Sequence, residues 1–113
     1  MIHDIHTSGL SIKKSTRRHI ERRIAFALGR FEDSINAISV TVEDTNGTRG
    51  GIDQLCRIRI SLQGERNPII AESKHEHLKA AIDMAADCIG RSVARALDKR
   101  HRSRRVPLIL ETA

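Results

Sequence analysis

The chain has 113 residues, with 20 Lys and Arg against 14 Asp and Glu, and its charge of +6 predicts one small basic domain without room for a second. Phe26 and Phe31 are the only aromatic residues, which excludes the base-stacking platforms that read single strands. The two distant cysteines, Cys56 and Cys88, indicate no disulfide framework and no zinc site. No apolar run approaches the roughly 20 residues that span a bilayer, and no leader pattern begins the chain. We therefore expect a cytoplasmic protein without cofactors.

The first half of the chain predicts a strand, a helix and a second strand. Residues 1–7 are a strand candidate, and residues 13–31 have helical periodicity. Residues 37–43 alternate between apolar and polar side chains, which is typical of a half-buried strand. The helix has an apolar stripe of Ile20, Ile24, Leu28 and Phe31, opposite the basic residues Lys14, Arg18 and Arg22.

The second half predicts two further strands and the longest helix. Residues 56–62 alternate in the same way, and residues 69–74 can return as a fourth strand. Residues 76–99 carry an apolar stripe that is suited to covering one sheet face. Gly90 interrupts this helix, and either close packing or a bend would explain it. The order βαβββα predicts an α+β fold, a four-stranded sheet with both helices packed on one face.

The expected domain covers residues 1–100, followed by a tail of residues 101–113. Arg100 falls on the apolar arc of the last helix, so we expect the helix to leave the domain near Lys99 and the tail to be loosely held. The apolar segment 106–110 within this tail could dock on the open sheet face or a partner, or stay frayed.

Positive charge concentrates on the helices, because residues 36–75 carry equal numbers of basic and acidic side chains. A solvated helix face is the ordinary explanation of such charge. Two basic helix faces and a basic tail together favour binding of a polyanion, and nucleic acid is favoured over a membrane because the basic faces lack an apolar wedge. The last helix presents a basic row within roughly 80° of arc, formed by Arg91, Arg95, Lys99 and Arg102.

Three short patterns are better explained without a site. The GxxG segment 47–50 joins two predicted strands, whereas the nucleic-acid clamp of a KH domain joins two helices. His75 and His77 lack the spacing of four that helical metal ligands prefer, and Cys88 has no partner or base. No nucleophile elbow, phosphate loop or carboxylate pair is present, so the sequence does not predict an enzyme.

A recurring family pattern is present in both halves of the chain. Its most specific positions are Ile70-Ala71-Glu72, Ala80-Ala81-Ile82-Asp83, Asp87, Arg91, Arg95 and Lys99, with Leu10, Ile12, Arg17, Glu21-Arg22-Arg23, Leu28, Phe31 and Ile35 in the first half. On these residues the sequence resembles the bacterial ribosome hibernation-promoting factor and ribosome-associated inhibitor family, also described as sigma modulation proteins, over most of residues 1–100.

The resemblance implies a βαβββα domain that occupies the mRNA channel and tRNA sites of the small ribosomal subunit and inhibits translation under stress or in stationary phase. Its helices would face ribosomal RNA through the basic residues. The chain looks like a short form, for which ribosome pairing would need a separate factor, and the sequence leaves self-association open. The expected RNA contacts are Lys14, Arg17, Arg18, Arg22, Arg91, Arg95, Lys99 and Arg102.

The chain departs from the family pattern at several positions. Lys79 replaces a usual Tyr, and often basic positions in the second helix hold Cys88, Ala94 and Leu97. The first helix opens on Lys13-Lys14 instead of Thr-Glu, which removes a cap and places positive charge at the positive end of the helix dipole. Two alternatives stay open: a general module for structured RNA, and a protein-interaction module that uses the open sheet face or the apolar tail.

Overall fold

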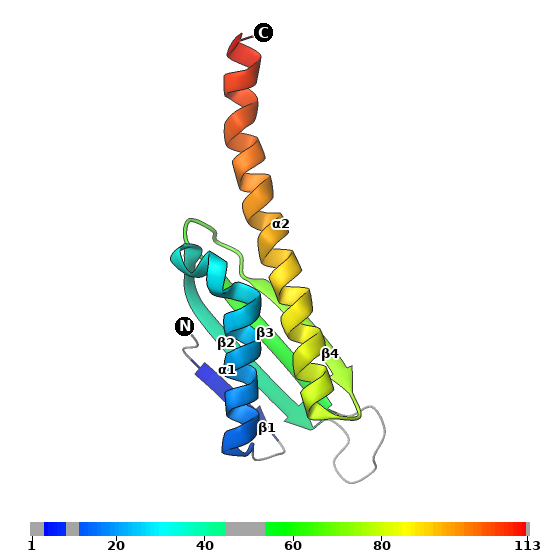
Figure 1. Ribbon diagram of the computed structural model, residues 1–113. Helices are drawn as coiled ribbons and strands as arrows, with labels where there is room; N and C mark the ends of the chain where they lie inside the picture. Colours follow the sequence, from blue (N-terminus) through cyan, green and yellow to red (C-terminus); the bar gives the residue numbers. More distant parts are fainter. Residues whose placement is uncertain (1–3, 9–11, 45–53, 113) are drawn as a thin grey trace.

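Two helices cover one face of a four-stranded sheet, and no helix among the described residues lies on the other face (Figure 1). The structure is a computed structural model that describes residues 4–8, 12–44 and 54–112, with only the backbone described at residues 4, 8 and 101–112. Its element order confirms the predicted α+β fold, βαβββα. The elements are β1 (Asp4–Ser8), α1 (Lys14–Leu28), the short 3-10 helix η1 (Gly29–Ser34), β2 (Ile35–Asp44), β3 (Gln54–Leu62), β4 (Ile69–His75) and α2 (Leu78–Thr112).

The strands lie in the order β1-β2-β3-β4. β1 pairs with β2 in parallel, and a parallel pair needs a crossover connection, which α1 supplies. β2 pairs with β3, and β3 with β4, in antiparallel register. Alternation along β2 and β3 directs one set of side chains toward the helices, as the sequence predicts. This set is Ile38, Val40, Val42, Cys56, Ile58, Ile60 and Leu62, all buried.

The core forms where this sheet face meets the apolar stripes of the helices. On α1 the predicted stripe residues Ile20, Ile24 and Leu28 are fully buried, and Phe31 packs against the core from η1. The single predicted helix over residues 13–31 is therefore an α-helix followed by a tighter turn. On α2 the predicted stripe is Leu78, Ile82, Ala85, Ile89, Val93 and Ala96, of which Ile82, Ala85, Ile89 and Val93 are buried and the other two are partly buried. Ala81 and Ala86 beside the stripe are buried as well.

Close helix packing explains Gly90. A Cβ built on Gly90 would lie 3.3 Å from both the Cβ and the carbonyl oxygen of Ala27 on α1. A side chain there would require Ala27 to move by a few tenths of an ångström, because 3.3 Å is tighter than most Cβ contacts. Of the two explanations that the sequence left open, packing is the one the structure supports.

The end of the last helix differs from the prediction. The predicted helix end near Lys99 is wrong, because α2 continues to Thr112 and projects beyond the sheet (Figure 1). Arg100 lies on the apolar arc, and its Nη2 donates to the Gln63 carbonyl oxygen at 2.6 Å and pairs with Glu65 Oε1 at 2.9 Å. A long side chain can cover apolar surface while its guanidinium reaches a polar turn. The projecting helix makes the molecule 63 Å long against 24 and 22 Å in the other directions.

Candidate nucleic-acid interface

The basic residues predicted on α1 form an outward row. Lys14, Arg18 and Arg22 are all exposed and follow one another at a spacing of four, so they share one side of the helix. The buried stripe faces the sheet, while His19 and Arg23 contact α2. Helical geometry then places the basic row on the outer side of α1 that points away from α2.

The start of α1 adds to this positive surface. Lys13 makes no side-chain capping bond, and the first turn holds no acidic residue, as the sequence indicates. The free N–H groups of a helix start already carry partial positive charge. Arg17 is exposed in the same first turn, although helical geometry places it on the arc of the buried stripe. This end of the helix therefore attracts anions.

The second row lies on α2. Arg91 and Arg95 are exposed on the side of the helix away from its buried stripe, and Lys99 is exposed nearer the edge of that stripe. Arg102 follows on the same helix, although its side chain lies outside the described part of the chain. The row starts where α2 packs on the rest of the domain and continues along the part of α2 that projects beyond the sheet.

The two rows do not merge into one surface. The helices run in the same direction (Figure 1), and the contacts between them join residues 64 positions apart: His19 to Asp83 and Arg23 to Asp87. Arg18 is therefore level with residue 82 of α2, whereas the centre of the second row is Arg95. At 1.5 Å per residue, the row centres are offset by about 20 Å along the helix direction. A ligand that contacts both rows must be long.

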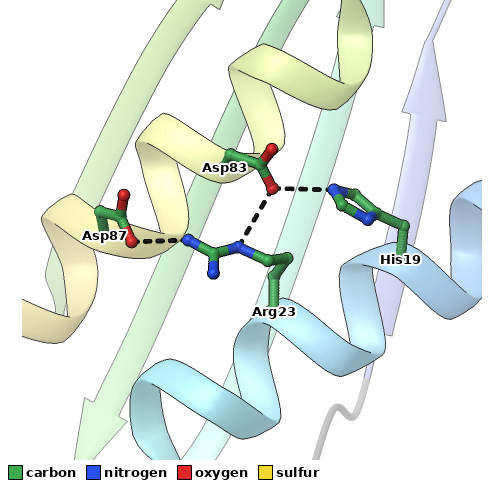
Figure 2. Close-up of polar contacts among 4 residues, drawn as sticks. All are labelled: His19, Arg23, Asp83 and Asp87. Atoms are coloured by element: carbon green, nitrogen blue, oxygen red, sulfur yellow. Dashed lines mark hydrogen bonds and ion pairs between the residues drawn. The ribbon is translucent and has the colours of Figure 1, made fainter.

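An ionic network between the rows connects α1 to α2, as Figure 2 shows. His19 Nε2 lies 2.8 Å from Asp83 Oδ1, and Arg23 Nε lies 3.0 Å from the same oxygen. Arg23 Nη2 donates to Asp87 Oδ1 at 2.6 Å. Arg23 is only 25% exposed, so its charge is engaged in holding the helices together rather than presented to solvent.

The sequence predicts neither this network nor the exposure of one aromatic side chain. Helical periodicity says nothing about which residue of another helix lies opposite, so the sequence did not indicate that Asp83 and Asp87 face α1. Phe26 is 84% exposed, in a groove between the helices. Its position outside the apolar stripe of α1 was the available signal. The expectation that no apolar side chain lies beside the basic faces is wrong at Phe26.

The remaining candidate groups do not form a second site. Burial raises the pKa of the Cys56 thiol from 9.0 to about 12, so this thiol stays neutral and unreactive. The His77 N–H donates to Nδ1 of His75 just before α2 begins, which gives that histidine a local structural contact. No metal-ligating cluster of three is found among residues 4–8, 12–44 and 54–100. The GxxG segment 47–50 lies outside the described residues.

Comparison with known proteins decides the family. Residues 4–101 match the family described as sigma 54 modulation protein / S30EA ribosomal protein. The chain belongs to this family. The match covers α1, the whole sheet and the part of α2 that packs on it, so the fold is that of the family domain.

Two solved structures have the same fold. The Thermus thermophilus Protein Y N-terminal domain superposes with a TM-score of 0.68 at 23% identity, over 83% of this chain and 96% of that one. A ribosomal subunit interface protein from Coxiella burnetii superposes with a TM-score of 0.66 at 15% identity, over 85% of this chain and 99% of that one. A search of curated protein sequences finds no match.

Within the described residues, no helix is long and apolar enough to cross a membrane.

Proposed function

We propose that this protein binds the small ribosomal subunit at the mRNA channel and tRNA sites and inhibits translation under stress or in stationary phase. The observation that carries the proposal is the pair of exposed basic rows on the helical layer of a domain from this family. One structural relative is a ribosomal subunit interface protein, which points to the same partner. The protein would act in the cytoplasm, where ribosomes are.

The proposed contacts are electrostatic. Phosphate groups of ribosomal RNA would bind the row on α2 and the row on α1, because exposed guanidinium and ammonium groups are the usual partners of the phosphate backbone. Inhibition follows from occupancy of the channel and needs no reaction step. The proposed contact residues are Lys14, Arg17, Arg18, Arg22, Arg91, Arg95, Lys99 and Arg102.

The test is co-sedimentation of the purified protein with separated ribosomal subunits across a salt series, with excess unrelated duplex RNA as competitor. We expect saturable binding to the small subunit that resists the competitor. Each phosphate contact that is lost should reduce the salt slope by roughly 0.7 to 1. The double variant Arg91→Glu with Arg95→Glu should therefore bind weakly and with a shallower slope.

A matched control is available on other surfaces. Arg59 is exposed on the open sheet face, and Arg66 is exposed in the turn between β3 and β4. The double variant Arg59→Glu with Arg66→Glu changes the net charge by the same amount, so it corrects for the general loss of positive charge. The proposal fails if the two double variants weaken binding equally.

Other outcomes identify the alternative functions. Binding that disappears into the competitor RNA would indicate a general RNA-binding domain. Binding to a protein that survives charge reversal on α2 would indicate a protein-interaction module. A translation assay with the same variants then tests inhibition, which should follow the order of the binding affinities.

A further inference from the structure

Phe26 is the most exposed large apolar side chain described in the protein. Its 84% exposure compares with 53% for Ile70 and 51% for Met84. Burying a Phe side chain stabilises a fold, and here the fold does not gain that contribution. A largely exposed aromatic ring of this kind is a feature of interaction surfaces.

The ring stands at one side of a groove between the helices. Small residues form the floor, since Ala27 and Gly90 meet at the closest approach of α1 and α2 and Ala94 follows one turn later. The guanidinium of Arg23 lies 5.9 Å from the centroid of the Phe26 ring. The groove has a volume of about 420 Å³, within the range of roughly 300–1,000 Å³ that small-molecule sites occupy.

The rim of the groove is positively charged. Arg30 lines it from η1 and Arg91 from α2, and both are exposed. Neither forms an ion pair within the part of the chain that the structure describes. The one acidic residue that lines the groove, Asp87, forms an ion pair with Arg23, whose Nη2 lies 2.6 Å from Asp87 Oδ1. An anionic group can therefore enter without an unpaired negative charge beside it.

We propose that this groove binds an unpaired nucleotide of RNA, with its base stacked on the Phe26 ring and an adjacent phosphate bound by Arg30 and Arg91. The inference rests on the proposed function and names the part of the RNA that this site takes. Arg91 also begins the basic row of α2, so the groove is continuous with the proposed phosphate path. A single ring suffices for one base, although the composition excludes a platform of several rings.

Tryptophan fluorescence tests stacking directly. The chain contains no tryptophan, so Phe26→Trp introduces a single indole at the site. Its fluorescence should be quenched by a short single-stranded RNA and by the small ribosomal subunit. An abasic strand of the same length carries the same phosphates without bases, and it should leave the fluorescence nearly unchanged. A fully paired duplex should also fail to quench.

Truncation gives the energetic test. Phe26→Ala should weaken binding of the single strand roughly 5- to 150-fold, the range for loss of one base–aromatic stack. Phe26→Leu should weaken it similarly, because leucine is apolar but offers no ring. Met84→Ala is the control, since Met84 is an exposed apolar residue of α2 outside the groove, and its change should leave binding as in the wild type.

Several results would overturn the stacking site. Equal quenching by the abasic strand would mean that no base stacks on the ring. Full binding of the single strand by Phe26→Leu together with loss in Phe26→Ala would mean that an apolar contact, and not base stacking, holds the RNA. Wild-type binding to the small subunit without quenching in Phe26→Trp would reject the inference and leave the proposed function standing. Quenching by single strands without small-subunit binding would support the stacking site and reject the proposed function.

Discussion

Arg22 and Arg23 are neighbours in α1 with different surroundings. Arg22 is exposed in the outward row, whereas Arg23 is 25% exposed and contacts Asp83 and Asp87 of α2. Helical geometry places successive residues 100° apart, so adjacent arginines point to different partners. Whether an arginine of α1 faces solvent or pairs with α2 therefore depends on its position around the helix.

Replacing Arg23 should destabilise the protein. Arg23→Ala removes the guanidinium that pairs with Asp87 and leaves Asp83 with His19 alone. Because Asp83 and Asp87 are 43% and 59% exposed, water can rehydrate them, and we expect a loss of about 1–2 kcal/mol in the free energy of unfolding. Urea unfolding measures this loss of stability. The matched control Arg22→Ala should change stability by less than about 0.5 kcal/mol, and equal effects would contradict the network.

The buried thiol of Cys56 makes stability depend on pH in the alkaline range. Its pKa is raised by burial from 9.0 to about 12. In the unfolded chain the thiol loses its proton from about pH 9 upward while the folded chain keeps it, so the unfolded state gains stability. The contribution is complete below pH 9.0 and is lost as the pH rises toward about 12.

This dependence can be isolated with one variant. Wild-type stability should fall more steeply above about pH 9 than that of Cys56→Ala, with a difference in slope of up to about 1.4 kcal/mol per pH unit. Urea unfolding at a series of pH values measures both slopes. Parallel curves for the two proteins would show that Cys56 does not keep its proton in the folded state.

At the scale of elements, the packing of α1 on α2 depends on a glycine. Gly90→Leu should destabilise the protein by about 1–3 kcal/mol, the usual cost of overpacking, because a Cβ already meets Ala27 at 3.3 Å. The control is Gly29, where a Cβ would meet nothing within 4 Å. Gly29→Leu should be neutral or slightly stabilising, since its backbone is helical and leucine favours helices. Thermal unfolding of both variants shows whether the close approach of Gly90 to Ala27 limits the stability of the protein.

At the scale of the whole molecule, the offset between the basic rows predicts independent contributions to binding. The pair Arg18→Glu with Arg22→Glu and the pair Arg91→Glu with Arg95→Glu alter rows whose centres are about 20 Å apart along the helices. Their effects on the free energy of ribosome binding should add within about 0.5 kcal/mol in the combined variant. Strong coupling would mean that both rows contact one phosphate cluster.

The sequence by itself determined the element order, the buried stripes and the exposure of the basic residues. Each of these follows from a local period: two residues for a strand and 3.6 for a helix. The periodicity of Ile38, Val40 and Val42 was enough to place them in the core. The family pattern along both helices is likewise carried by the order of residues alone.

Only the tertiary structure decided how these elements meet. It placed Asp83 and Asp87 opposite Arg23, brought Gly90 against Ala27, left Phe26 in an open groove, and let Arg100 reach the turn after β3. It also offset the two basic rows. These are contacts between residues far apart in the chain, and no local period encodes which of them lie opposite one another. These contacts are set when the side-chain surfaces of two helices pack against each other.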